Sequence, residues 1–268
     1  MPMRYLEAQG LTGLWVVTLF HFLPAIVIFP FIAQNYMLER QNRLVSLVSG
    51  GLMGCGFVLY SLGLIVGSVT KTTVLFYLTP IWATLLAYVV LSELVELRRW
   101  LALSGGLIGC LLVMRIDPFS FDYDYVDLFG LAAGVSWAMG SVVIRRFPDA
   151  DFVHITFIQY FIGGLLAAAT AILLGNPLPT LNSFVSAIPV ALLASVVVFL
   201  PSVLLIFRIM QYLSPGLIGI LMLSEVLVAA LSSWLFLNEA LNLLQWVGVL
   251  AILATGLILG LSEKSESA

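Results

Sequence analysis

The sequence predicts an all-α membrane protein, a polytopic bundle of about nine transmembrane helices built from two inverted repeats. Hydrophobic residues make up 62% of the 268 residues and charged residues only 9%, and the mean hydropathy is +1.12. A soluble domain of this size has about 25% charged residues. Nine apolar runs approach the roughly 20 residues that cross a bilayer. A shift of 146 positions also places the stretch 68–111 on 214–257.

The residues that coincide in this shift are of types that are rare in so apolar a chain. They form the pairs Ser68 and Ser214, Glu93 and Glu239, and Trp100 and Trp246. Leu and Ala also coincide, but these residue types are too common here to carry weight. A repeat of this length in lipid-compatible helices is typical of transporters whose two halves share one plan.

The predicted helices follow the apolar runs in order, with short connections between them. Their ranges are 11–33, 45–66, 72–92, 98–115, 127–146, 153–175, 184–210, 216–237 and 241–261. The most polar interior stretch is an Asp-rich segment between the fourth and fifth runs. It separates a first repeat over 11–115 from a second repeat over 127–262, with an extracytoplasmic linker at 116–126.

The basic residues near helix ends predict the orientation, because cytoplasmic loops of membrane proteins carry an excess of Lys and Arg. Nine crossings place eight of the 11 Lys and Arg residues on one side, together with the C-terminus. We therefore expect the C-terminus in the cytoplasm and the N-terminus outside. The third and eighth helices correspond and lie five crossings apart, so the two repeats point in opposite directions.

The first repeat has four predicted helices and the second has five. The counterpart of the fifth helix would end just before Met1 when it is moved back by 146 positions. Either an opening helix has been lost, or the true start codon lies upstream, and we favour the second explanation. An upstream reading frame that encodes ~20 apolar residues would decide between them.

Several function classes find no support in the sequence. The net charge of −3 offers no basic surface for nucleic acid. Cys55 and Cys110 lie singly in apolar runs, which favours packing over a metal or redox role. No phosphate-binding loop is present, and the tetrapeptide at 134–137 departs from the G-x-S-G of an intramembrane serine protease. We expect no enzyme, no catalytic residue, no cofactor and no metal site.

Three segments resemble the EamA-like members of the drug/metabolite transporter superfamily. They are LTPIWA at 78–83 with Glu93 and Trp100, SWAMGS at 136–141 with Arg145 and Arg146, and RIMQYLSP at 208–215 with Glu225, Glu239 and Trp246. The resemblance covers about residues 11–262. It implies two inverted five-helix repeats around a central cavity, which is here a 4+5 arrangement that lacks the first helix. Val226 stands where the family often has a proline, which weakens the expectation of a kink there.

Glu225 is the sharpest candidate for the substrate site. It lies about 16 Å into the eighth helix, close to the midplane. A carboxylate costs about 2.5–3.5 kcal/mol at that depth, so it should face the interior or a cavity. Burial favours the neutral carboxyl form, which suits proton coupling or pairing with a substrate amine. The alternative is a neutral glutamic acid that is hydrogen-bonded to a neighbouring helix.

Tyr77, Thr79 and Pro80 are the substrate-binding candidates of the first repeat. Thr79 and Pro80 occupy the positions equivalent to Glu225 and Val226. A proline inside a membrane helix frees a carbonyl group and bends the axis, and bent helices at the midplane are where transporters bind. The alternative is a polar stripe that packs against another helix.

Five further candidates lie on other helices. They are Trp137, Ser141, Gln159 and Tyr160 as substrate contacts, and His21 for proton coupling. Trp137 is either an aromatic wall of the cavity or core filler, and Gln159 with Tyr160 either meets a ligand or bonds between helices. His21 relays protons or is a packing histidine. Glu93 and Glu239 lie at helix ends, where capping or orienting the next helix explains them.

These observations favour a secondary active transporter that moves small organic metabolites across the plasma membrane. We expect this membrane to be a bacterial inner membrane. Alternating access between the inverted repeats would expose one midplane site to each side in turn. The partners expected are the metabolite and membrane lipid, and we expect no nucleic acid. A homodimer is a further alternative. A channel and a non-transporting scaffold or receptor are the alternatives.

Overall fold

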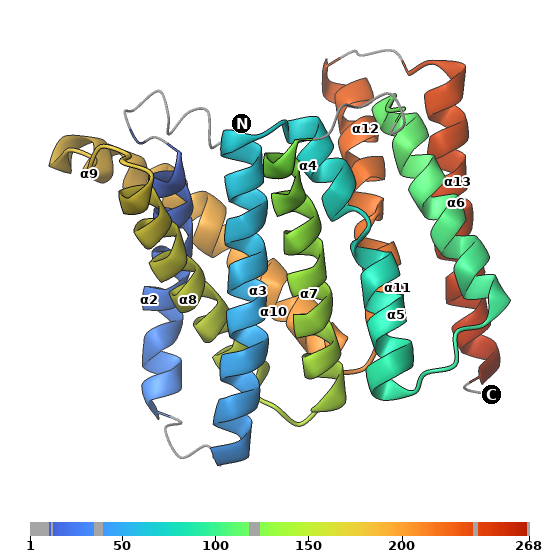
Figure 1. Ribbon diagram of the computed structural model, residues 1–268, viewed down its shortest axis with the longest axis horizontal. Coiled ribbons are helices and arrows are strands. Elements are labelled where there is room, and N and C mark those ends of the chain that lie inside the picture. Colours follow the sequence, from blue (N-terminus) through green and yellow to red (C-terminus); the bar gives the residue numbers. More distant parts are fainter. Residues whose placement is uncertain (1–10, 12, 35–39, 118–123, 238–240, 267–268) are drawn as a thin grey trace.

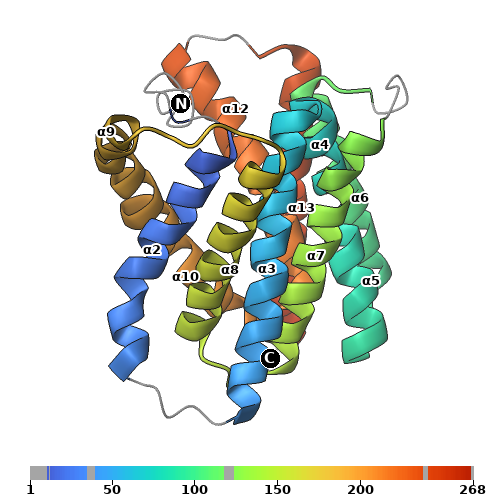
Figure 2. The same cartoon turned by 60° about the vertical axis from the view of Figure 1, so that its left-hand side comes forward.

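The computed structural model describes residues 11, 13–34, 40–117, 124–237 and 241–266. Over these residues the protein is an all-helical bundle without β-strands (Figure 1 and Figure 2). Its helices are α2 (Leu14–Gln34), α3 (Arg40–Val66), α4 (Val69–Phe76), α5 (Thr79–Leu91), α6 (Leu97–Met114), η2 (Tyr125–Asp127), α7 (Leu128–Arg146), α8 (Phe152–Leu173), α9 (Leu181–Ala191), the π-helix η3 (Leu192–Phe199), α10 (Leu200–Met210), α11 (Pro215–Met222), α12 (Ser224–Leu237) and α13 (Leu243–Glu266).

Eight helical stretches of the described chain are long and apolar enough to cross a membrane. They confirm the first eight predicted spans, with boundaries that move by a few residues. The ninth predicted span corresponds to α13, whose apolar stretch Leu243–Gly256 is shorter. Three of the nine spans are composite in the structure: α4 with α5, α9 with η3 and α10, and α11 with α12.

The interior of the bundle lies where α3 packs against α7 on one side and α8 on the other, with α2 against α8 (Figure 1). Large buried side chains fill this region, including Met53, Ile155 and Phe207. Glycine allows the helices to approach closely, because a Cβ atom at Gly54 would lie 2.7 Å from the Gln159 carbonyl oxygen. Small residues at such crossings are typical of membrane bundles.

The repeat-equivalent helices α6 and α13 pack against each other in opposite directions (Figure 1). Gly106 faces Thr255, and Gly109 faces Ile252. In the repeat, Ile252 is the equivalent of Gly106, and Thr255 is the equivalent of Gly109. Exchanging the two copies therefore turns the first contact into the second. Such reciprocal contacts are what a two-fold relation requires. The two copies are therefore related by an approximate two-fold axis, as the inverted repeat predicts.

A second antiparallel contact joins the two copies where α5 meets α11. Gly216 faces Thr84 and Gly219 faces Pro80, so the order of the contacts reverses along the two chains. A Cβ atom at Gly216 would lie 2.3 Å from Thr84 Oγ1. This close crossing therefore depends on α11 having glycine, which has no side chain, at both positions.

The paired serines of the repeat have the same role in both copies. Ser68 is the N-cap of α4 and accepts a hydrogen bond from the Lys71 backbone N–H. Ser214 is the N-cap of α11 and accepts one from the Leu217 backbone N–H. An N-cap serine satisfies one of the free N–H groups at a helix start. The need for this cap explains why serine occurs at the same place in both repeats.

The seventh span contains an element that the sequence pattern did not predict. The π-helix η3 lies between Pro189 of α9 and Pro201 of α10. A proline has no N–H for the regular helical hydrogen bond, and π segments arise where that ladder is disturbed. The two prolines account physically for the irregular stretch between them.

Candidate functional site

The third span is interrupted near its middle, between α4 and α5. Pro80 has no backbone N–H to donate to the Phe76 carbonyl oxygen, which would be its partner in a continuous helix. The hydroxyl of Thr79 donates to that oxygen instead. The Thr-Pro pair therefore both breaks the helix and satisfies the carbonyl group that the break leaves free.

The eighth span is interrupted at the equivalent place. Leu223 separates α11 from α12, and the shift of 146 positions places it on Tyr77 at the break of the third span. The Val226 N–H donates to the Leu223 carbonyl oxygen at 3.2 Å, a three-residue step instead of the helical four. The absence of a proline at Val226 had weakened the expectation of a kink. The structure nevertheless has the break in both copies.

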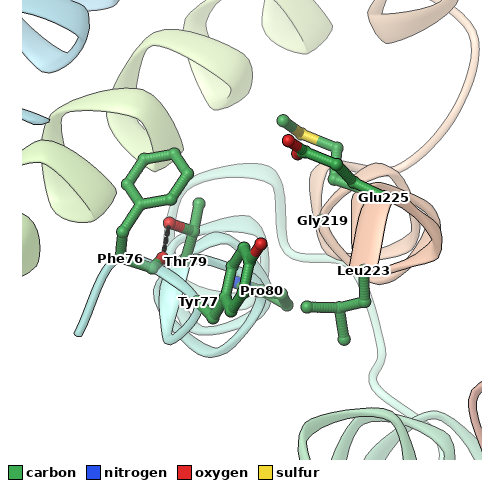
Figure 3. Close-up of a pocket in the computed structure, with 8 residues that line it drawn as sticks. Phe76, Tyr77, Thr79, Pro80, Gly219, Leu223 and Glu225 are labelled. Atoms are coloured by element: carbon green, nitrogen blue, oxygen red, sulfur yellow. Dashed lines mark hydrogen bonds between the residues drawn. The ribbon is translucent and has the colours of Figure 1, made fainter. Parts of the chain in front are cut away.

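A pocket lies between the two breaks (Figure 3). Six of its lining residues form three repeat-equivalent pairs, which are Phe76 with Met222, Tyr77 with Leu223, and Thr79 with Glu225. Pro80 and Gly219 complete the lining. The pocket therefore lies on the approximate two-fold axis, where the two copies meet.

Glu225 is the only charged residue among the eight that line this pocket. Figure 3 shows its side chain on the second break, facing the side of the pocket formed by Tyr77 and Thr79. Glu225 is the eleventh residue of the span that begins at Pro215, which places it about 16 Å deep. Its side chain is exposed, so a ligand in the pocket can reach the carboxylate.

The substrate candidates of the first repeat all lie in this pocket. Tyr77, Thr79 and Pro80 belong to its lining, together with Glu225. The structure thus brings together four of the eight predicted substrate contacts, from two spans that are far apart in the sequence. Phe76, Gly219, Met222 and Leu223 were missed. The shift of 146 positions could have found Leu223, because it is the equivalent of the predicted contact Tyr77.

The remaining candidates lie in the packed interior and do not line this pocket. Trp137 is 6% exposed and lies between the rings of Phe57 and Phe207, with both ring centroids 6.2 Å away. His21 and Tyr160 meet edge to face, with ring centroids 5.7 Å apart. These contacts agree with the core-filling alternative for Trp137.

Several polar atoms of this interior group have no hydrogen-bond partner within the described part of the chain. They are both side-chain amide atoms of Gln159, the Tyr160 hydroxyl oxygen and His21 Nε2. His21 Nδ1 lies 2.8 Å from the Val17 carbonyl oxygen. The Ser141 hydroxyl donates to the Ala138 carbonyl oxygen of its own helix at 2.7 Å. A role for these residues in transport stays a prediction.

Ion pairs tie the third span to the fifth span, which consists of η2 and α7, at both ends of the bundle. Lys71 Nζ lies 3.5 Å from the buried Asp127 carboxylate, which also accepts from the Ser68 N–H at 3.4 Å. At the other end, Glu93 lies 3.6 Å from Arg99 and 3.7 Å from Arg145. The Arg99 contact agrees with Glu93 orienting the following helix. Its equivalent, Glu239, lies outside the described residues.

The sequence pattern of the EamA-like transporter family matches residues 6–115 and 124–261 of the chain. A protein named S-adenosylmethionine uptake transporter, from Rickettsia prowazekii (strain Madrid E), is 28% identical over 128 residues. This match covers 47% of the chain and 43% of that protein, so the chain spans less than half the length of that relative. A protein named uncharacterized transporter, from Archaeoglobus fulgidus, is 29% identical over 194 residues, which is 71% of the chain and 66% of that protein.

A solved crystal structure has the same fold as the described bundle. It superimposes with a TM-score of 0.72 and covers 98% of this chain and 92% of that chain, at 17% sequence identity. At this identity the likeness concerns the fold alone. It shows that the arrangement of helices around the pocket occurs in a protein of distant sequence.

Proposed function

The chain belongs to the EamA-like transporter family, and from this we propose that it is a secondary active transporter of small organic metabolites. The pocket between the two helix breaks would be the substrate site, and alternating access would open it to each side of the membrane in turn. The observation that supports this most is the position of the pocket, which three repeat-equivalent residue pairs line. A site on the axis between inverted copies is reached equally from both sides.

The two halves that rock around the pocket would be the segments 11–115 and 127–262, joined by an extracytoplasmic linker at 116–126. The C-terminus would lie in the cytoplasm, because that orientation places most Lys and Arg residues inside. Glu225 would contact the substrate and carry a coupling proton, since it is the acidic side chain in the pocket. His21 stays a second candidate for proton coupling, because its Nε2 has no partner among the described residues.

Alternating access can be tested without knowledge of the substrate. In the background Cys55→Ser with Cys110→Ala, the substitution Met222→Cys places one thiol in the lining of the pocket. A membrane-impermeant thiol reagent is applied to right-side-out and to inside-out vesicles. We expect modification from both sides, because the pocket opens in turn to each. The matched control is Ala138→Cys, whose position is fully buried in α7 and should react from neither side.

Modification from one side only would contradict alternating access, and modification from neither side would place the substrate path elsewhere. A second arm addresses the metabolite. Metabolite profiles of cells that lack or overproduce the protein should identify a compound whose level changes. Uptake of that compound in proteoliposomes should then be lost in Glu225→Gln but kept in Asp149→Asn, which removes an exposed carboxylate far from the pocket.

A further inference from the structure

We propose that the pocket selects organic cations, meaning small compounds with a weakly hydrated positive group such as an ammonium or sulfonium. This inference rests on the proposed function, because it names the substrate class of the same site. Two independent features of the described pocket support it. One is the charge of its lining, and the other is the set of aromatic rings beside Glu225.

The lining carries one negative side chain and no positive one. Glu225 has no ion-pair or hydrogen-bond partner among the described residues, and Lys, Arg and His are absent from the lining. An ionised carboxylate near the bilayer midplane is costly without a partner. A bound cation would supply that partner. An anionic ligand would instead meet a like charge in an apolar surrounding.

Three aromatic rings lie next to one another on this side of the pocket. The Tyr60 and Phe76 ring centroids are 4.6 Å apart, and those of Phe76 and Tyr77 are 6.4 Å apart. Phe76 and Tyr77 line the pocket. The Tyr60 hydroxyl oxygen lies 3.2 Å from Thr73 Oγ1, which fixes its ring on α3 against α4. Aromatic faces attract cations, and organic ammonium groups most of all, because these lose little hydration on binding.

The same lining does not suit an inorganic cation. Hard metal ions require several oxygen ligands, whereas the pocket offers one carboxylate, two hydroxyl groups and otherwise apolar side chains. The described residues also contain no group of three or more His, Cys, Asp or Glu side chains that could hold a metal ion. An organic cation therefore fits the chemistry of the lining better than a metal ion does.

The test compares three probes of similar size and different charge, which are benzyltrimethylammonium, benzyl alcohol and benzoate. Each is titrated calorimetrically into the purified full-length protein in lipid nanodiscs. We expect wild-type protein to bind the cation at least about tenfold more tightly than the alcohol, and benzoate most weakly. Glu225→Gln should lose at least about tenfold of the affinity for the cation and keep its affinity for the alcohol.

Two variants separate the contributions of charge and ring. Phe76→Leu should weaken binding of the cation about two- to tenfold, with a smaller effect on the alcohol. Asp149→Asn is the control and should bind all three probes as wild type does. If Glu225→Gln does not fold, protection gives the same information, because benzyltrimethylammonium should slow the modification of Met222→Cys more than benzyl alcohol does.

Equal or tighter binding of benzoate or benzyl alcohol by the wild type would overturn the inference, as would unchanged binding of the cation by Glu225→Gln. Binding of none of the three probes, together with no protection of Met222→Cys, would overturn it too. These outcomes leave the proposed function standing if Met222→Cys is still modified from both sides of the membrane. If the protein bound the cation selectively but Met222→Cys were not modified from both sides, the inferred cation site would stand and the proposed alternating access would be contradicted.

Discussion

The contact between α5 and α11 gives a prediction that depends on a single atom, the Oγ1 of Thr84. Gly216→Ala would place a Cβ atom 2.3 Å from Thr84 Oγ1 and 3.3 Å from Thr84 Cβ. Overpacking of this kind costs about 1–3 kcal/mol. The better helix propensity of alanine offsets at most about 1 kcal/mol of that. We therefore expect Gly216→Ala to lower the free energy of unfolding by about 1–2 kcal/mol.

The partner residue decides whether the clash is the cause. Thr84→Ala removes Oγ1, which has no hydrogen-bond partner among the described residues, so the contact next closest to the new Cβ atom is at 3.3 Å. The double variant with Thr84→Ala should regain most of the stability. Thr84→Val keeps a branched side chain of the same shape and should not rescue Gly216→Ala.

The assay is thermal unfolding in detergent, followed with a thiol-reactive dye. The Cys110 thiol is 2% exposed and reacts when the fold opens. In a chain of this length a loss of 1–2 kcal/mol corresponds to a midpoint lower by roughly 2–8 °C. The reasoning would be refuted if Thr84→Val rescued as well as Thr84→Ala, or if Gly216→Ala unfolded at the wild-type midpoint.

Three further predictions follow from the described contacts and use the same assay. Ser68→Ala and Ser214→Ala should each cost about 1 kcal/mol through the lost N-cap, and the double variant should be additive to within about 0.5 kcal/mol; strong non-additivity would contradict independent caps. Asp127→Asn should destabilise by about 2–4 kcal/mol because it removes the charge of the buried Asp127 carboxylate, which pairs with Lys71, and an unchanged midpoint would show that this pair does not hold the third span. Gly109→Ala should destabilise by about 1–3 kcal/mol, since its Cβ would lie 2.9 Å from the Gly248 carbonyl oxygen, whereas Gly256→Ala, with open space around it, should be neutral or slightly stabilising; equal effects would contradict the described crossing.

Much of the fold could be predicted from the sequence because it depends on patterns that repeat. Apolar runs of membrane-spanning length gave the helices, and Ser68 with Ser214 marked equivalent helix starts. The break of the third span was visible in Pro80. The break of the eighth span and the π-helix were not, because the first lacks a proline and the second depends on how two prolines are accommodated in three dimensions.

The candidate site was predicted in part, and the division has a physical cause. Glu225 and Thr79 stand out because polar residues are rare at their depth. Phe76 and Met222 do not, because an apolar side chain that lines a pocket looks the same in the sequence as one that faces lipid. Gln159 and Tyr160 show the converse, since polar residues in a membrane helix indicate a buried position without saying whether a cavity lies beside it.

The chamber carries its charge on one wall only, because a hydroxyl group stands in the first copy where a carboxylate stands in the second. A chamber of two identical walls would hold a ligand equally well in either of two orientations related by the axis. With Thr79 on one wall and Glu225 on the other, a polarised ligand has a single preferred orientation. Exchanging the two residues, Thr79→Glu with Glu225→Thr, should move the preferred position of a positive ligand group to the wall of the first copy.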